Sequence, residues 1–419
     1  MGSFFGNRWW VVFASICGLL VGAGAVHIFA FGVFLKPVTE DLGIGRGLMS
    51  SGLIITSSLN ALGCLPLGYL IDRFGVRRVM MPGIIFYALG IAGWALLSPS
   101  PWVIYATFFG AGLFGAIGSP VPYGAMLSLW FDRQRGLAIG IAMAGVGLGV
   151  AIVPQLAAFF IRTHGWRWAY VDLAIVTLVL AWLPVAIFVR EPNAKDRAKQ
   201  ADVAVADGSL PGRTAMEALR SWRFWALTVA FFLAIAAING TLTHIVALLT
   251  DRGVPLQMAT GLLSAAGIAL LIGRIVSGWC LDRFYGPYVA IAFFIIPMVG
   301  IALLGSGAGG VVPLCGAVLC GLSVGAEVDI MAFFISRYFG LKAYGKIYGM
   351  MFALFAFANG IGPSIAGGSY DRYHSYRPAF MIFEILLVLT CILLAPLGEY
   401  PYPARRHGAP DAGGAKVPA

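Results

Sequence analysis

The chain has 419 residues, of which 60% are apolar and 11% are charged. Soluble proteins carry about 25% charged residues, so this composition excludes an ordinary water-soluble domain. The net charge of +10 would favour a nucleic-acid partner in a soluble protein, but the placement of the basic residues explains it here, and we expect no such partner. The 6 cysteines lie in apolar runs without C-x-x-C spacing, so we expect neither a metal nor a redox site.

Apolar runs long enough to cross a membrane recur along the whole chain, since a transmembrane helix needs about 20 mostly apolar residues. The predicted helices are 9–35, 48–71, 79–98, 102–130, 136–161, 168–189, 223–249, 257–281, 287–307, 311–337, 345–369 and 377–397. The first run lacks a cleavage site and should remain as a helix. The sequence therefore predicts an all-α integral membrane protein with twelve transmembrane helices, both of whose termini lie on one side.

The gaps between these helices differ strongly in charge. Of the 28 basic residues, 20 lie on the side that carries the termini, 7 lie on the other side, and Arg274 lies within a predicted helix. Basic residues concentrate in cytoplasmic loops, so we expect both termini to be cytoplasmic.

A long polar stretch without periodicity separates the sixth and seventh helices. The string GYLIDRFG at 68–75 returns as GWCLDRFYG at 278–286, which places Asp72 and Asp282 at equivalent positions after helices 2 and 8. Such a recurrence indicates two repeated halves. The predicted parts are a six-helix half at 1–190, a cytoplasmic linker at 191–222, a second half at 223–400 and a cytoplasmic tail at 401–419.

The string GYLIDRFGVRR at 68–78 resembles the loop signature of the major facilitator superfamily. Asp72 can sit near a helix terminus or pair with a basic residue, while arginines hold the cytoplasmic loop. The predicted gate and loop residues are Asp72, Arg73, Arg77, Arg78, Asp282 and Arg283.

Three further strings are similar to monocarboxylate transporters and oxalate:formate antiporters: WWVVFAS at 9–15, FGVFLKPV at 31–38 and WFDRQRGLAIGIAMAG at 130–145. RYFG at 337–340 and YGKIYG at 344–349 are similar to bacterial members. The resemblance implies a bacterial inner-membrane carrier that works by alternating access and functions as a monomer. Its partners would be a small carboxylate, the lipid bilayer and a coupling proton, with no further cofactor.

Arg274 lies 8 residues before Asp282, about 12 Å deep in a hydrocarbon core of about 30 Å. An arginine at that depth costs at least about 2.5 to 3.5 kcal/mol, so it needs a partner or a watery surrounding. Its planar fork of donors suits a carboxylate, and we expect it to bind a substrate carboxylate. The alternative is a permanent ion pair with Glu327 or Asp329. The resemblance also implies a substrate-binding arginine in helix 8.

Glu327 and Asp329 have a depth similar to that of Arg274, and one of them is expected to neutralise it and to accept a proton when substrate arrives. They are two residues apart and point about 200° apart on a helix, so they cannot both face one partner. Asp329 has a second interpretation as a gate bridge to Arg283 or Arg337.

Asp251 closes the seventh helix, and His244 lies 7 residues earlier on the same face. By resemblance Asp251 is a candidate for proton coupling with the arginine of helix 8, and a solvated carboxylate at a helix end is the alternative. His244 and His27 are candidates for substrate binding, or else form hydrogen bonds between helices.

Tyr123 is flanked by Pro120 and Pro122, which open the backbone, and its hydroxyl is a candidate donor to the substrate. Asn359 is a further candidate, although polar groups in lipid often serve only packing. Segment 347–365 contains no lysine or arginine, whereas the oxalate:formate antiporters have a second basic residue there. One arginine therefore favours one carboxylate.

These observations predict a proton-coupled symporter of a small monocarboxylate such as lactate or pyruvate. The alternatives are an anion exchanger of the oxalate and formate type, an exporter of another small organic compound, or a sensor that binds without transport. The sequence contains no H-E-x-x-H and no G-x-S-x-G, so we expect no enzyme.

Overall fold

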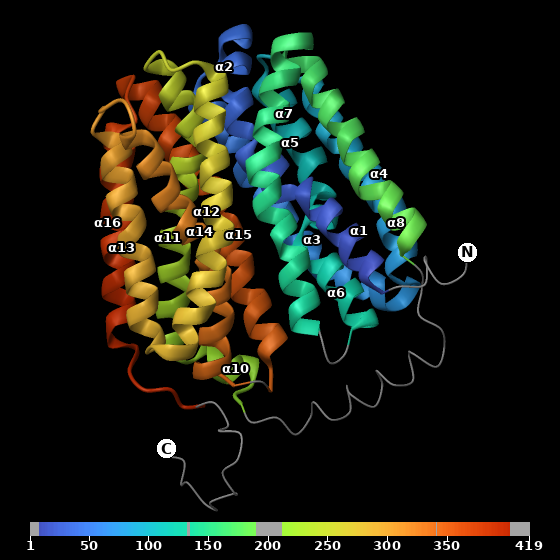
Figure 1. Ribbon diagram of the computed structural model, residues 1–419, viewed down its shortest axis with the longest axis vertical. Coiled ribbons are helices and arrows are strands. Elements are labelled where there is room, and N and C mark those ends of the chain that lie inside the picture. The colour runs from blue at the N-terminus through green and yellow to red at the C-terminus, as the bar shows by residue number, and fades with distance from the viewer. Residues whose placement is uncertain (1–7, 132–134, 190–211, 341, 403–419) are drawn as a thin grey trace, which may run out of the picture.

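The computed structural model describes residues 8–131, 135–189, 212–340 and 342–402, and these ranges contain helices and short connections but no strand element. Figure 1 shows the helices running roughly parallel in two groups, one on each side of the molecule. We call the end of the bundle that carries α10 (Ala215–Leu219) the α10 end, and the opposite end the Arg46 end.

The first half consists of residues 8–189. Its helices are α1 (Trp9–Leu20), a π-helix (Gly24–Phe29), α2 (Phe31–Leu42), α3 (Arg46–Phe74), α4 (Val76–Gly93), α5 (Pro101–Leu113), α6 (Pro120–Trp130), α7 (Arg135–Thr177) and α8 (Leu183–Phe188).

The second half consists of residues 212–402. After α10 its helices are α11 (Trp222–Asp251), α12 (Leu256–Arg283), α13 (Gly286–Gly305), α14 (Val312–Tyr338), α15 (Tyr344–Tyr373) and α16 (Arg377–Leu394). The linker predicted at 191–222 therefore ends in a helix, which begins with a capping box between Thr214 and Glu217. The rest of that linker, 190–211, lies outside the described residues.

Two predicted helices, 9–35 and 102–130, are broken in the structure. The two breaks lie against each other, because a side chain at Gly22 would meet the Gly118 carbonyl at 2.5 Å and one at Gly118 would meet the Ala23 nitrogen at 2.9 Å. Interrupted helices are tolerated in a membrane where neighbouring protein covers the freed backbone groups.

The predicted gap between helices 5 and 6 is a sharp turn inside one long segment. Gly165 adopts φ 78° and ψ 164° there, a conformation that is open to glycine and strained for other residues. Ten segments of the described residues are long and apolar enough to cross a membrane, and one of them, Leu137–Phe188, has 52 residues and turns back at Gly165. Counting it twice and adding the broken segment 101–130 gives twelve crossings in the described chain.

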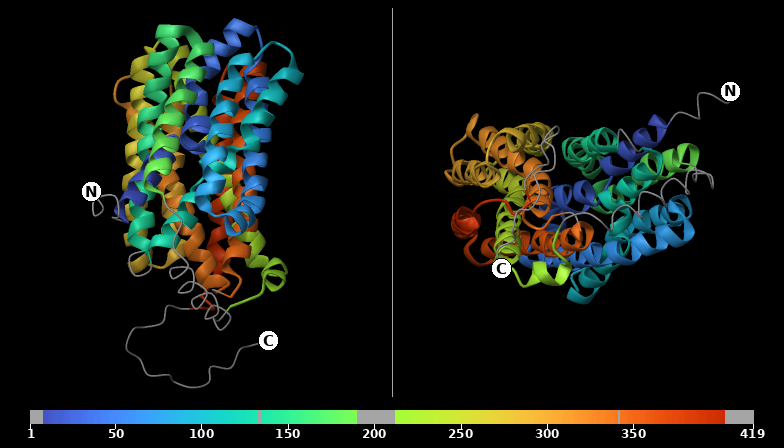
Figure 2. Two further views of the ribbon diagram at one scale, coloured as in Figure 1. Left: turned by 90° about the vertical axis from the view of Figure 1, so that its right-hand side faces the viewer. Right: turned by 90° about the horizontal axis from the view of Figure 1, so that it is seen from below.

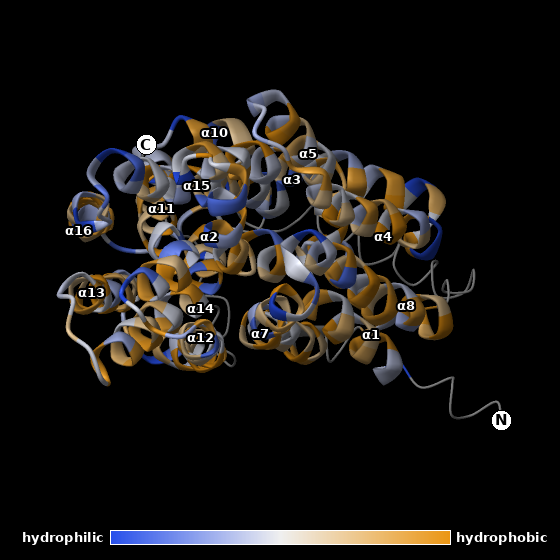
Figure 3. Cartoon of the chain, turned by 90° about the horizontal axis from the view of Figure 1, so that it is seen from above, coloured by the Kyte–Doolittle hydropathy of each residue, from blue (hydrophilic) through white to orange (hydrophobic). Residues whose placement is uncertain are grey.

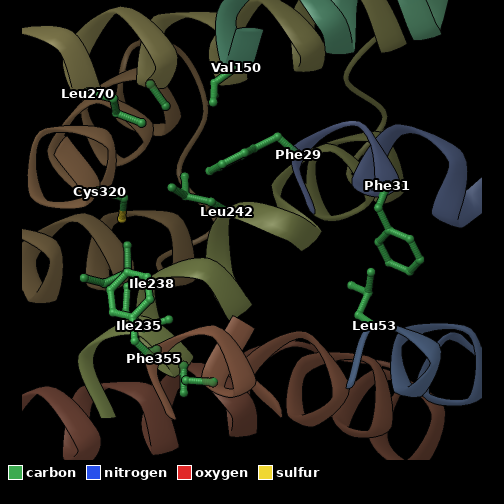
Figure 4. Close-up of a cluster of buried hydrophobic side chains, with 14 of the residues drawn as sticks. Phe29, Phe31, Leu53, Val150, Ile235, Ile238, Leu242, Leu270, Cys320 and Phe355 are labelled. Carbon is green, nitrogen blue, oxygen red and sulfur yellow. The ribbon is translucent and has the colours of Figure 1, made fainter. Parts of the chain in front are cut away.

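Among the described residues, the buried core joins the two halves toward the Arg46 end. One cluster of buried residues takes side chains from both halves, and Figure 4 shows part of it, where Phe29 and Val150 of the first half lie near Leu242 of the second. A second cluster contains residues of the first half alone, between Val11 and Val189. Apolar burial therefore holds the halves together at one end more than at the other.

The backbones of the two halves touch toward the Arg46 end. A side chain on Gly267 of α12 would lie 2.6 Å from the Ala151 nitrogen of α7, and one on Gly360 of α15 would lie 2.6 Å from the Ile54 nitrogen of α3. Three glycines lie on the same helix faces, each 11 residues from Ala151, Gly267 or Gly360 in the direction of the α10 end, and meet nothing within 4 Å: Gly140, Gly278 and Gly349. The halves therefore separate toward the α10 end, and the view from below in Figure 2 shows the two groups of helices side by side.

Large apolar side chains cover the outside of the bundle. Ile275 is 74% exposed, Leu89 60% and Ile392 59%. In Figure 3 the peripheral helices, including α4, α8 and α13, are coloured predominantly as hydrophobic. A surface of this kind is what a bilayer requires of a multi-pass membrane protein.

Candidate functional site

Arg274 and Asp329 form an ion pair at the point where the halves separate. The Arg274 Nε lies 3.1 Å from the Asp329 Oδ2, and the two side chains keep 20% and 37% of their exposure. Arg274 is 7 residues from Gly267 and 4 from Gly278, so it lies on the face of α12 that meets α7. The pair therefore borders the open space between the halves rather than a sealed core.

Asp329 reaches Arg274 because α12 and α14 pack closely beside it. A side chain on Gly325 would meet the Arg274 backbone nitrogen at 2.9 Å, and Asp329 lies one turn further along the same face of α14. Of the two predicted acids, Asp329 is therefore the one that neutralises the arginine. The alternative bridge from Asp329 to Arg283 or Arg337 is not formed in this structure.

Glu327 lies on the other side of α14, where it is 1% exposed. Its Oε1 has no hydrogen-bond partner within the described part of the chain. The 200° separation expected for two residues on a helix is what places one acid at the space between the halves and the other in the core.

Aromatic side chains of α15 line the approach to the ion pair. Tyr344, Tyr348 and Phe352 stack in sequence, with ring centroids 6.0 and 5.7 Å apart. Tyr348 lies close enough to Arg274 and Asp329 to interact electrostatically with both. Its hydroxyl is a candidate second donor that the sequence did not single out.

Tyr123 lies across the interface at a similar depth. Its hydroxyl occupies the space beside Gly18 of α1. Two residues before Gly18, Ile16 packs against Gly145 of α7. On the same stretch of α7, Gly147 packs on Leu271, which is one turn from Arg274. Tyr123 itself is only 1% exposed and is thus held in the first half's core.

Asn359 bonds to another asparagine in the second half. The Asn239 Nδ2 of α11 donates to the Asn359 Oδ1 of α15 at 2.7 Å, in a buried position. This geometry supports the packing interpretation of Asn359, and Asn239 is a partner that spacing along the sequence gave no means of finding.

A dense polar cluster closes the Arg46 end, and most of it was not anticipated. The Arg46 guanidinium of α3 donates to Asp251 of α11 at 3.0 Å and to the Tyr376 hydroxyl before α16 at 2.6 Å. Its Cζ lies 3.7 Å from the centroid of the Tyr370 ring. The Lys36 Nζ lies 3.1 Å from Asp251. We call these five side chains the outer cluster.

The coupling hypothesis required Asp251 to lie beside Arg274. The structure does not place it there. Arg274 lies 18 residues beyond the start of α12, which is about 27 Å along the helix from the end that carries Asp251. The structure pairs Asp251 with Arg46 and Lys36 of the first half instead.

His244 of α11 lies 7 residues before Asp251, deeper in the bundle than the outer cluster. It is fully buried, and its Nε2 lies 3.2 Å from the Ser50 hydroxyl of α3. His27 is 2% exposed, packs on Tyr87 and Trp94, and has no hydrogen-bond partner for either ring nitrogen among the described residues. The structure brings neither histidine to Arg274.

Asp371 of α15 caps the first turn of α3 from the opposite half. Its two carboxylate oxygens accept from the backbone N–H groups of Arg46 and Gly47, each at 2.7 Å. The first N–H groups of a helix lack internal partners, so this carboxylate satisfies donors that only the closed arrangement places beside it.

The loop motif lies at the opposite end of α3 and is mostly exposed. The Arg77 Nη2 donates to the Ala186 carbonyl at 2.8 Å, which ties α4 to α8 within the first half. Arg73 donates to the Tyr69 hydroxyl, and Arg283 stacks on Trp279. Arg78 and Asp282 are exposed, and the side chain of Asp72 lies outside the described residues.

The described residues contain no group of three or more His, Cys, Asp and Glu side chains placed to hold a metal ion.

Comparisons with known proteins place this geometry in a family. The model of the Major Facilitator Superfamily matches residues 14–363. An uncharacterised MFS-type transporter, YcxA of Bacillus subtilis (strain 168), is 25% identical over 88% of each chain. Monocarboxylate transporter 4 of Rattus norvegicus is 27% identical over 94% of this chain and 83% of its own. The oxalate:formate antiporter of Oxalobacter formigenes is 27% identical over 66% of this chain and 62% of its own.

Solved structures agree on the fold. A mutant of the nucleoside transporter NupG superposes with a TM-score of 0.72 at 15% identity, covering 93% of this chain and 99% of that one. A bacterial homologue of the human lysosomal transporter Spinster, in an inward-facing and occupied conformation, gives a TM-score of 0.68 over 93% of this chain and 95% of that one, also at 15% identity.

Proposed function

The chain belongs to the Major Facilitator Superfamily, whose model spans most of it, and from this premise we propose that it is a secondary active transporter of a small monocarboxylate of the lactate and pyruvate type. The observation that carries the proposal is the Arg274–Asp329 pair beside the space between the halves. A substrate carboxylate replaces Asp329 as the partner of Arg274, because a guanidinium offers a carboxylate two parallel hydrogen bonds.

Proton coupling follows from the same exchange. When substrate binds Arg274, the Asp329 carboxylate loses its counter-ion at membrane depth, where an unpaired charge is costly. Protonation of Asp329 removes that cost, so substrate and proton travel together. Asp329 is thus a better candidate for the proton carrier than Glu327 or Asp251, which do not contact Arg274.

The separated α10 end is the open side of the carrier, and the outer cluster is its closed gate. We propose that the α10 end faces the cytoplasm of a bacterial inner membrane, with both termini on that side. The excess of basic residues at that end supports this orientation. Rocking of the halves about the central pair then supplies alternating access.

The test is uptake of radiolabelled lactate into proteoliposomes, with and without an inward proton gradient, for the wild type, Arg274→Ala and Asp329→Asn. We expect gradient-driven accumulation by the wild type and none by Arg274→Ala. Asp329→Asn should bind lactate but lose its response to the gradient. Arg162→Ala, which removes an exposed arginine elsewhere, is the matched control. Wild-type uptake that Arg274→Ala leaves intact would refute the clamp.

An anion exchanger is the second candidate, favoured by the similarity to an oxalate:formate antiporter. It predicts uptake that is stimulated by a carboxylate loaded inside the vesicle and is indifferent to the proton gradient. The same vesicles, preloaded with lactate, formate or oxalate, separate the two functions.

A further inference from the structure

A separate pocket lies at the Arg46 end of the second half, about 27 Å along α12 from Arg274. It has a volume of about 340 Å³ and is enclosed by the ends of α11, α13 and α15 and the start of α16. The polar side chains in its wall are those of Asp251, Arg252, Tyr370, His374, Ser375, Tyr376 and Arg377. The pocket thus belongs to the outer face of the molecule and is distinct from the central pair.

The arginines of this pocket are not neutralised by carboxylates of the described residues. The Arg377 guanidinium has no hydrogen bond or ion pair with any described residue, and its backbone N–H alone donates to the Ser375 hydroxyl. Arg252 makes one hydrogen bond, to the Leu304 carbonyl at 2.8 Å, which leaves its other donors available. The one carboxylate in the wall, Asp251, already pairs with Arg46 and Lys36.

The pocket also shares side chains with the closed gate. Asp251, Tyr370 and Tyr376 line it on one side and contact Arg46 on the other. An anion between Arg252 and Arg377 therefore sits one side chain away from the contact that keeps the halves together.

We propose that this pocket is an outer binding site for a small soluble anion of the carboxylate type, held by the guanidinium groups of Arg252 and Arg377. Two unneutralised guanidinium groups facing one small space suit a single carboxylate. Its role as the first stop of an incoming substrate rests on the proposed transport function, whereas the binding itself does not.

A lipid phosphate could pair with the same arginines as a soluble carboxylate. The surroundings of the pocket distinguish the two ligands. The neighbouring groove between α13 and α16, of about 660 Å³, shares Arg377 and faces outward among Val299 and Met381. It contains an acid, Glu384, whose Oε1 is without a partner in the described chain. The 340 Å³ pocket is lined by residues of the outer connections, which favours a ligand from water.

The experiment measures anion binding with the central site removed. In the double variant Arg274→Gln/Asp329→Asn, purified in detergent, sodium acetate at constant ionic strength should raise Tm along a saturating curve. Adding Arg252→Gln and Arg377→Gln should weaken the apparent acetate affinity at least about tenfold, because two charge-assisted contacts are lost. Arg162→Gln removes the same charge from the same end in the other half, and should leave the affinity unchanged.

A second variant guards against loss of folding. Ser375→Asp places a carboxylate in the pocket without removing an arginine, and it should abolish the acetate response. The proposal would be overturned if acetate gave no saturating rise of Tm in Arg274→Gln/Asp329→Asn. It would also be overturned if that rise survived both the arginine changes and Ser375→Asp. So would a response to added phosphatidylglycerol but not to acetate, which would assign the arginines to lipid. Because no transport is measured, failure here leaves the lactate proposal standing, and failure of lactate uptake leaves this one standing.

Discussion

Arg46 contacts three side chains of the opposite half at once. It reaches Asp251, Tyr370 and Tyr376 while its side chain keeps 7% exposure. A guanidinium can do this because it is planar, forks to two acceptors and stacks on a ring at the same time. A lysine has one point of charge and lacks that geometry.

Replacing Arg46 by lysine is therefore expected to loosen the closed gate. Loss of one charge-assisted bond and the ring contact favours the state open at the Arg46 end by about tenfold or more. Ser50 is fully buried below the outer cluster, so a cysteine there reports the opening. In a background without the 6 native cysteines, a membrane-impermeant thiol reagent should modify Ser50→Cys about tenfold faster in Arg46→Lys.

The control for this measurement is Arg162→Lys, which alters an exposed arginine whose guanidinium lies 5.9 Å from the Phe159 ring of its own helix. That change should leave the modification rate of Ser50→Cys as it was. An equal rate in Arg46→Lys would show that Arg46 does not hold the gate.

Variants of the Asn239–Asn359 pair should change the stability of the protein without changing substrate binding. Asn359→Ala should cost about 0.6 to 1.7 kcal/mol in the free energy of unfolding, the usual range for a hydrogen bond between helices in a membrane. Asn239→Ala should cost about as much, and the double variant little more than either, because one bond links the two residues. KM for lactate should not change. A rise in KM in Asn359→Ala alone would return this residue to the substrate site.

Depth and helical period placed Arg274 level with Glu327 and Asp329 without choosing between the two acids, and they did not predict the outer cluster. The position of Arg274 near the midplane and the 200° between Glu327 and Asp329 follow from spacing alone. Arg46 appeared only as one basic residue in an outer gap, since its partners Asp251 and Asp371 are 205 and 325 residues away. No local pattern reports a contact over that separation.

At the scale of elements, glycines determine how closely the helices of the two halves approach. Gly267 of α12 lies against the backbone of α7, whereas Gly261 of the same helix has the flexible end of Gln155 as its nearest neighbour, at 3.7 Å. Small residues permit such approach in lipid, where packing rather than apolar burial drives association.

Gly267→Leu should therefore destabilise the closed arrangement by about 1 to 3 kcal/mol, the usual cost of forcing atoms into a packed contact. Gly261→Leu should be tolerated. Thermal unfolding in detergent measures the first effect, and lactate uptake should fall in Gly267→Leu and persist in Gly261→Leu. Equal behaviour of the two variants would mean that the α7 contact does not limit stability.

The positions of most helices could be predicted from apolar runs. Pro120 and Pro122 indicated an opened backbone in the fourth predicted helix, but the break in the first could not be predicted. Gly22, Gly118 and Pro120 are ordinary in membrane helices, and nothing local shows that the two breaks face each other. The turn at Gly165 was predicted as a gap, and in the structure two helices meet at this one glycine, whose backbone is not helical.

At the scale of the whole molecule, the repeat of the DRFG-type string predicted two halves, whereas the end at which they meet could not be predicted. A carrier that works by alternating access closes at one end in one state and at the other end in the other state. Because both states share one sequence, the sequence does not say which end is closed.

The closed end can be locked. An ideal Cβ on Gly47 of α3 lies 3.1 Å from the Gly368 Cα of α15, whereas one on Gly368 meets nothing within 4 Å and therefore points away from α3. A short bifunctional methanethiosulfonate reagent should therefore join Gly47→Cys to Gly368→Cys in a protein without the native cysteines. Uptake should then stop and return with reductant. Each single variant should transport with and without the reagent. A cross-linked protein that still transports would exclude opening at this end.

The carboxylate of Asp371 has a further consequence, for hydration. It satisfies the first N–H groups of α3 only while the halves are together, so opening must replace it there with water molecules. The transition therefore takes up water at the Arg46 end, and its rate should fall as an excluded osmolyte lowers water activity outside the vesicle. Asp371→Ala, which leaves these groups hydrated in both states, should be less sensitive to the osmolyte.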